Sequence, residues 1–149
     1  MRANELIDEH NIVKGLMAQL CAASGGRKAE EVSALRWKIN RILLAHLAKE
    51  DRLVYPALIS SGDRRTASTA HLICAEVGDL AHKWRHYLSY WTVARIREDG
   101  EAFRAQTIAV EQALLARIER EETELFPLLQ CTSSNSSRPN GSANAAGRV

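Results

Sequence analysis

The chain has 149 residues, of which 46% are hydrophobic and 26% charged, a composition typical of one ordinary globular domain. Its 20 basic and 18 acidic residues nearly cancel, so the charge favours neither nucleic-acid binding nor attachment to a membrane surface. No apolar run approaches the roughly 20 residues that span a bilayer, and the N-terminus is charged where a signal peptide needs an apolar core, so we expect a cytoplasmic protein.

The first predicted helix extends from about Asn4 to Ala23 and ends before two glycines, which commonly terminate helices. Apolar residues recur along it at steps of three and four, the spacing of one helix face. They are Leu6, Val13, Met17 and Leu20. His10 fills the gap in this series and is therefore expected to face inward.

The second predicted helix extends from about Lys28 to Ser60, and a Ser-Gly-Asp turn follows it. Its stripe of apolar residues consists of Val32, Leu35, Ile39, Ile42 and Leu53. His46 and Glu50 occupy the same stripe one helical turn apart. A histidine and a glutamate are therefore both predicted on the face that meets the core.

The third predicted helix extends from about Arg64 to Arg97 and has a regular apolar repeat. The repeat consists of Ile73, Val77, Leu80, Trp84, Tyr87, Trp91 and Ala94. We interpret its aromatic residues as core packing rather than as a binding site for a cofactor. Trp37 of the second helix lies off the apolar stripe and is expected at the surface.

The fourth predicted helix extends from about Glu101 to Gln130, with Phe103, Val110, Leu114 and Leu125 in phase. Four long amphipathic helices joined by short turns predict an all-α fold, an up-down-up-down antiparallel four-helix bundle over residues 1–130. Residues 131–149 are rich in Ser, Asn and Gly and have little to bury, so we predict a disordered polar tail.

The three cysteines are Cys21, Cys74 and Cys131, and no two of them form a CxxC motif. Their number and spacing exclude a zinc site and a disulfide framework. We expect two of them to act as small buried hydrophobic residues.

Two segments of the chain resemble each other. HLAKEDRLVYPAL, which begins at His46, aligns without a gap with RIEREETELFPLL, which begins at Arg117, 71 residues later. The alignment pairs Glu50 with Glu121, but it pairs His46 with Arg117. This mismatch between a histidine and an arginine is the main functional question that the sequence raises.

The helical periodicity directs five ionisable side chains inward from three helices: His10, His46, Glu50, Arg117 and Glu121. Unpaired buried charge is costly, so these groups must neutralise one another or bind an ion. A histidine and a glutamate at i and i+4 can supply two ligands to one metal or to a metal pair. The interiors of four-helix bundles commonly hold iron sites made of carboxylates and histidines.

Over about residues 3–130 the sequence resembles the hemerythrin-like (HHE cation-binding) domain family. The resemblance rests on His10, on HLAKEDRLVYPAL and on REETELFPLL. It implies a four-helix bundle around a non-haem di-iron centre, in proteins that bind O₂, store or sense iron, or act in nitric-oxide and oxidative-stress responses. Carried over by position, the ligands are His10, His46, Glu50 and Glu121, with Glu122 as a weaker alternative to Glu121.

The sequence departs from the family pattern in two places. The histidine of the fourth helix is Arg117 in this chain, and an arginine has no lone pair to offer a metal. The third helix should also supply a histidine, and His82 and His86 have the spacing of a ligand pair, but their phase directs them away from the core. Glu76 lies at the height of the ligands on the second helix and is an alternative, as is a third helix without any ligand.

These observations leave competing functions open. The first is a metal-binding protein that senses or stores iron, or binds a gas such as O₂ or NO, through an incomplete ligand set. The alternative is a metal-free signalling or interaction module in which Arg117 replaces a ligand and pairs with Glu50 and Glu121. An enzyme of the di-iron oxidase type is not expected, because no complete carboxylate cage or further acid-base pair is evident. The expected cofactor is non-haem iron, as a di-iron pair, a single ion, or none.

Overall fold

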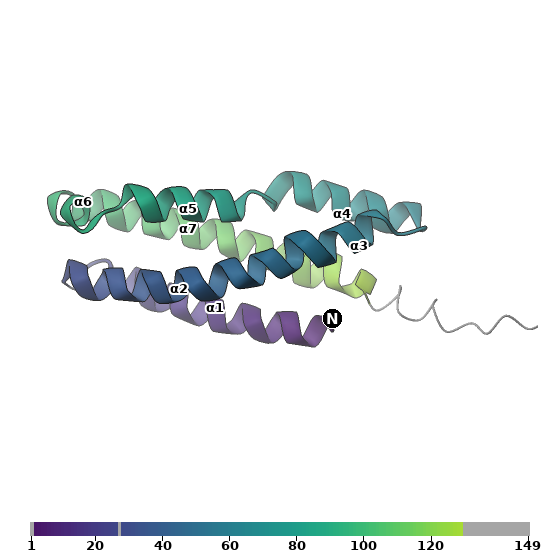
Figure 1. The fold of residues 1–149 in the computed structure, drawn as a ribbon, viewed down its shortest axis with the longest axis horizontal. Coiled ribbons are helices and arrows are strands. Elements are labelled where there is room, and N and C mark those ends of the chain that lie inside the picture. The colour runs from purple at the N-terminus through teal and green to yellow at the C-terminus, as the bar shows by residue number, and fades with distance from the viewer. Residues whose placement is uncertain (1, 27, 130–149) are drawn as a thin grey trace, which may run out of the picture.

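The computed structural model describes residues 2–26 and 28–129, and every regular element in these ranges is a helix (Figure 1). In chain order the elements are α1 (Ala3–Ala23), α2 (Ala29–Lys49), the π-helical turn η1 (Glu50–Val54), α3 (Tyr55–Ile59), α4 (Arg64–Val77), α5 (Leu80–Tyr90), α6 (Val93–Glu98), α7 (Gly100–Arg120) and the π-helical turn η2 (Glu121–Leu125).

These elements form four antiparallel legs, which confirms the predicted all-α bundle. The first leg is α1, the second runs from α2 to α3, the third from α4 to α6, and the fourth consists of α7 and η2. Contacts join α1 to α2 and to α7, and join α5 to α7 and to α2, so neighbouring legs close around one core. The predicted polar tail, residues 131–149, lies outside the described residues.

The third leg is broken where the sequence predicted one continuous helix from Arg64 to Arg97. The helix α4 ends at Val77, and a Cβ atom on Gly78 would lie 2.3 Å from the carbonyl oxygen of Cys74. A larger residue would therefore have to displace the backbone at this point. A second break follows at Trp91, and the side chain of Thr92 caps the next helix by accepting a hydrogen bond from the backbone N–H of Arg95.

The second break is stabilised by Arg36, an arginine of α2 that is only 2% exposed. Its guanidinium group donates hydrogen bonds to the carbonyl oxygens of Trp91, at 2.6 Å, and Leu88, at 2.9 Å. Carbonyl groups in the last turn of a helix lack partners within that helix, so a donor from another element is needed to satisfy them when they are buried. Arg36 thus satisfies the end of α5.

We expect Arg36→Ala to lower the free energy of unfolding by about 3 kcal/mol, because it leaves buried carbonyl groups without donors. Arg41→Ala, on an exposed position of the same helix, should change it by less than about 0.5 kcal/mol. Urea denaturation of both variants measures the difference. Equal losses for Arg36→Ala and Arg41→Ala would contradict this role of Arg36.

Both π-helical turns begin at the two aligned glutamates, Glu50 and Glu121. A π turn contains one residue more than an α turn, so the inward face moves on by one position along the sequence. Val54 is accordingly 3% exposed, whereas Leu53, which the sequence pattern placed on the core stripe, is 57% exposed. The prediction for Leu53 is wrong for this reason.

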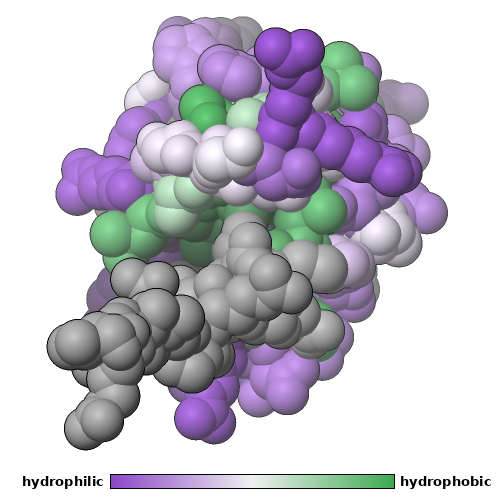
Figure 2. All heavy atoms as spheres, turned by 90° about the vertical axis from the view of Figure 1, so that its right-hand side faces the viewer, coloured by the Kyte–Doolittle hydropathy of each residue, from purple (hydrophilic) through white to green (hydrophobic). Residues whose placement is uncertain are grey.

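The apolar core consists of two clusters. One fills the half of the bundle around α5 and includes Trp84, Tyr87 and Trp91, which confirms that these aromatic residues pack in the core. The other fills the end near α3 and η2. Figure 2 views this end of the molecule and shows hydrophobic side chains reaching the surface among hydrophilic ones.

A polar layer lies between the two apolar clusters. It consists of the five ionisable residues that the helical periodicity directed inward, and each of them is at most 3% exposed. They are His10, His46, Glu50, Arg117 and Glu121. The inward orientation predicted for all five is therefore confirmed.

Other predicted positions are partly corrected. Cys74 is exposed and Cys21 is half-buried, so the expectation of two buried cysteines is wrong for Cys74, while Cys131 lies outside the described residues. Trp37 is 61% exposed, as its position off the stripe predicted. Within the described ranges, no helix combines the length and the apolar character that crossing a membrane requires.

Candidate metal centre

Four side chains from three legs converge in the polar layer. His10 lies on α1, His46 near the end of α2, and Glu50 and Glu121 at the first positions of η1 and η2. One nitrogen or oxygen atom from each lies within 4.8 Å of the corresponding atom of every other. Two ligands on opposite sides of one ion lie about 4.2 Å apart, since each bond is about 2.1 Å long. Small inward shifts would therefore allow these atoms to enclose one cation.

Each converging side chain has one buried polar atom without a hydrogen-bond partner. Nε2 of His10, Nε2 of His46, Oε2 of Glu50 and Oε1 of Glu121 are all buried, and none makes a hydrogen bond within the described residues. Nε2 of His10 lies 3.4 Å from Oε2 of Glu50 and 3.3 Å from Oε1 of Glu121, without the geometry of a hydrogen bond. Buried polar atoms in folded proteins nearly always have a partner. The donor set therefore fits a cation.

Arg117 contacts the other oxygen atom of each glutamate. Its Nε lies 3.1 Å from Oε2 of Glu121, and its Nη2 lies 3.3 Å from Oε1 of Glu50 and 2.7 Å from Oδ1 of Asp51. The hydroxyl of Tyr55 donates a second hydrogen bond to Oε2 of Glu121, at 2.8 Å. Each glutamate thus has one oxygen beside Arg117 and one oxygen without a hydrogen bond.

The pKa of each group in the cluster depends on the charges of its neighbours. Burial disfavours the charged form of His10, but the carboxylates of Glu121 and Glu50 outweigh this effect and raise its pKa to about 10. Burial likewise acts against the charge of Arg117, yet the same two carboxylates raise its pKa above the usual value. In the metal-free cluster a protonated His10 and Arg117 therefore face the buried carboxyl groups of Glu50 and Glu121. The carboxylates of Glu50 and Glu9 raise the pKa of His46 as well, so an incoming metal ion competes with protons for both histidines.

Within the described residues, the third leg supplies no side chain to the cluster. His82 and His86 are exposed, as their helical phase predicted. Glu76 is also exposed and forms an ion pair with Arg120 of α7. Glu76 therefore lies outside the group of converging side chains, and the third leg contributes apolar residues such as Ile73 to the neighbouring core.

Sequence reasoning missed three residues that hold the cluster. Glu9 lies 2.6 Å from Nδ1 of His46, and Asp51 and Tyr55 hold Arg117 and Glu121. Helical spacing did not predict that Tyr55 faces the cluster, because the π turn moves the inward face by one residue. The sequence does show that Tyr55 aligns with a phenylalanine in the repeated segment, so only the first of the two segments has a hydroxyl at this position.

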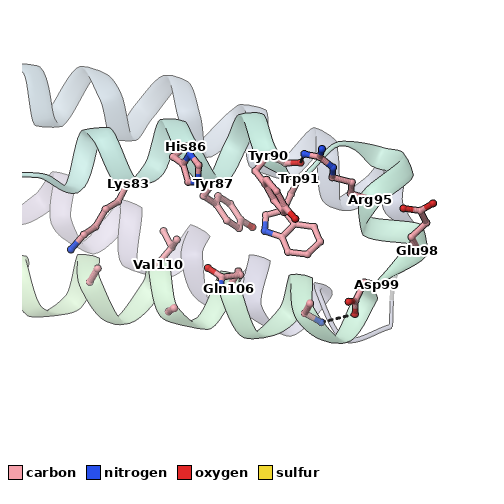
Figure 3. A pocket seen from close by; sticks show the side chains of 13 residues that line it. Lys83, His86, Tyr87, Tyr90, Trp91, Arg95, Glu98, Asp99, Gln106 and Val110 are labelled. Carbon is pink, nitrogen blue, oxygen red and sulfur yellow. Dashed lines mark hydrogen bonds between the residues drawn. The ribbon is translucent and has the colours of Figure 1, made fainter.

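An open groove of about 820 Å³ lies between α5 and α7, apart from the cluster. Figure 3 shows Tyr87 and Trp91 extending from the third leg toward α7 along this groove. None of the four converging residues lines it. The groove and the polar layer are therefore separate features of the molecule.

Comparison with known proteins agrees with the geometry. Residues 1–129 match the family model described as the hemerythrin HHE cation binding domain. Searches of curated proteins and of solved structures gave no significant match. The matched range includes all four converging residues and Arg117. The chain therefore belongs to the hemerythrin HHE cation-binding domain family.

Proposed function

We propose that this protein binds one divalent metal ion, non-haem iron, through His10, His46, Glu50 and Glu121, and that Arg117 replaces a second ion. The observation that carries the proposal is the arrangement of the two glutamates. Each presents one oxygen to Arg117 and leaves the other buried without a hydrogen bond. A carboxylate that bridges two metal ions gives one oxygen to each ion. Here the guanidinium group takes the place of one of the two ions.

The charge of Arg117 argues against a second ion. Two metal ions in one site lie about 3.5–4 Å apart and share bridging ligands. Arg117 has no lone pair, stays protonated, and already occupies Oε1 of Glu50 and Oε2 of Glu121. A second divalent ion at these oxygens would be repelled by the positive charge of Arg117. The side chain of Arg117 is 1% exposed, so water screens this repulsion little.

The donor set suits several transition metals, because imidazole nitrogens and carboxylate oxygens bind iron, manganese and zinc. We assign iron on the basis of family membership. An iron ion bound in this position would supply a redox-active centre or a coordination position for a small ligand. Sensing of iron, O₂ or NO stays a prediction from the family.

The residues of the chain have separate parts in this proposal. His10 and His46 would offer their Nε2 lone pairs, and Glu50 and Glu121 would offset the charge of the ion. Arg117 holds both carboxylates in place from the other side. The apolar clusters above and below the polar layer keep bulk water away from the ion.

A second function, a metal-free signalling or interaction module, is favoured by the same ion pairs. Arg117 contacts Glu50, Glu121 and Asp51, so the layer can neutralise much of its charge without a metal. Against this function stand the four buried atoms that make no hydrogen bond. Metal content separates the two functions.

The test is elemental analysis of protein purified without chelators, together with two variants. We expect bound metal in the unmodified protein and in His82→Ala, because His82 is exposed and outside the cluster. His46→Ala should lose it, because a site that loses one of four ligands binds metal far more weakly. Unmodified protein that binds no metal even after loading with Fe(II) would contradict the proposal and favour the metal-free module.

A further inference from the structure

We infer that Glu9 and Glu122 are positioning residues, each of which directs one histidine of the cluster toward the ion. Glu9 is not among the predicted metal ligands, and the sequence predicted Glu122 only as an alternative ligand to Glu121. The inference rests on the proposed function, since it describes how the same site is held ready for its metal ion.

The contacts of the two carboxylates are matched. Oε2 of Glu9 lies 2.6 Å from Nδ1 of His46, and Oε1 of Glu122 lies 2.9 Å from Nδ1 of His10. In both histidines the opposite nitrogen, Nε2, faces the cluster and has no hydrogen-bond partner. In both imidazole rings a carboxylate therefore holds Nδ1, whereas Nε2 has no hydrogen-bond partner.

Each contact joins two different legs. Glu9 and His10 are adjacent on α1, so this helix supplies one ligand to the cluster and holds the histidine of α2 with the next side chain. Glu122, in turn, reaches from η2 to α1. The orientation of each histidine is thus fixed by a helix other than its own, which connects the packing of the legs to the geometry of the site.

The chemistry follows from the two nitrogen atoms of imidazole. A neutral ring whose proton is on Nδ1 has its lone pair on Nε2. A carboxylate that accepts a hydrogen bond from Nδ1–H fixes this tautomer, orients the ring and makes Nε2 a stronger ligand. Glu9 and Glu122 are placed to do this for His46 and His10.

Further contacts keep the carboxylates and rings in position. The other oxygen of Glu9 forms an ion pair with Lys49 of α2. The ring of His10 stacks on Phe126, with a centroid distance of 5.3 Å, and meets the ring of His46 edge-on at 4.7 Å. Glu9 and Glu122 are each 28% exposed in their side chains, so they join the buried ligands to the surface.

The experiment measures Co(II) affinity by competition with a chelator, together with the visible absorption spectrum of the Co(II)-loaded protein. We expect Glu9→Ala to weaken binding about 10- to 100-fold, the usual effect of removing an outer partner of a metal ligand. Glu9→Gln should recover most of the affinity, because an amide oxygen still accepts a hydrogen bond from Nδ1–H. Glu5→Ala, on an exposed position of α1, is the control and should bind like the unmodified protein.

The corresponding variants of Glu122 distinguish a positioning residue from a ligand. Glu122→Gln should also recover the affinity lost in Glu122→Ala, with the Co(II) spectrum of the unmodified protein. An amide is a poor metal ligand, so equal losses in both variants, with a changed spectrum, would identify Glu122 as a ligand and overturn its assigned role. Glu119→Ala, an exposed glutamate of α7, is the control.

Two outcomes separate this inference from the function on which it rests. If the unmodified protein binds Co(II) and Glu9→Ala binds it equally well, the inference is overturned while the proposed function stands. If the unmodified protein binds neither Co(II) nor Fe(II), both are overturned. Circular dichroism of each metal-free variant confirms that it is folded. Glu9→Met and Glu122→Met, which nearly keep the side-chain length but offer no oxygen to Nδ1, replace an alanine variant that does not fold and should show the same loss of affinity.

Discussion

Arg117→His is expected to raise the iron bound at saturation from about one ion per chain to about two. The substitution removes a fixed positive charge from beside the two glutamates and supplies a lone pair in its place. It also releases Oε1 of Glu50, Oε2 of Glu121 and Oδ1 of Asp51, all of which now contact the guanidinium group. Carboxylates and a histidine are a donor set that holds iron in bundle interiors.

The measurement for Arg117→His is anaerobic loading with Fe(II), removal of unbound iron and elemental analysis, followed by exposure to air. A second ion should bring an absorption band of an oxo-bridged pair, which the unmodified protein should lack. Arg120→His is the matched control, because Arg120 lies three residues away on α7 and contacts Glu76 and Glu124 at the surface. Unchanged iron content in Arg117→His would show that Arg117 does not limit the site to one ion.

Arg117→Met is expected to lower the free energy of unfolding of the metal-free protein by about 3–5 kcal/mol, the usual cost of removing one partner from a buried ion pair. Glu50 and Glu121 are fully buried, and in this variant they would lose their permanent cation. Methionine keeps much of the apolar stem of arginine, so packing should contribute little to the loss.

Denaturation in urea with EDTA present measures this effect for Arg117→Met. Addition of a divalent metal should restore part of the stability, because an ion bound only to the folded state stabilises it. The control is Arg120→Met, whose surface ion pairs should be worth less than about 1 kcal/mol. A loss no larger in Arg117→Met than in Arg120→Met would contradict the view that Arg117 neutralises the layer.

Much of the polar layer could be predicted from the sequence, because helical periodicity is sufficient to orient residues on straight helices. His10 and His46 lie on α1 and α2, where steps of three and four continue undisturbed, and both are buried. The same periodicity correctly directed His82 and His86 to the surface. The repeated segment also indicated that Glu50 and Glu121 occupy equivalent positions.

Helical periodicity could not predict which residues face the core after a π turn, or where a helix is interrupted. The π turns at Glu50 and Glu121 move the inward face by one residue, which exposes Leu53 and buries Tyr55. The third leg is interrupted at Gly78, where the close carbonyl group of the preceding turn excludes a side chain. These are local features of the backbone that hydrophobic spacing does not encode.

Contacts between legs were also beyond the reach of periodicity. Glu9 lies beside an inward position on α1, and its role depends on the neighbouring helix α2, which presents His46 to it. Arg36 is buried because the end of α5 needs donors, although an arginine in an amphipathic helix is usually exposed. Such partners are set by the packing of the legs rather than by the pattern within one helix.

The two aligned segments keep equivalent glutamates but differ in the residue four positions earlier. His46 leaves Nε2 open toward the cluster, whereas Arg117 fills the equivalent side with a cation that contacts both glutamates. The bundle thus keeps both ligands of the first segment, His46 and Glu50, whereas the second segment keeps Glu121 and has a permanent charge, Arg117, in place of the histidine. This asymmetry is the basis for assigning one ion rather than two.

The central claim is most directly tested by the number of Fe(II) ions that the unmodified protein binds at saturation under anaerobic conditions. An equilibrium titration should reach one ion per chain, with no absorption band of an oxo-bridged pair after exposure to air. Saturation near two ions per chain, with that band, would contradict the replacement of an ion by Arg117, and the absence of any saturable binding would contradict the metal site itself.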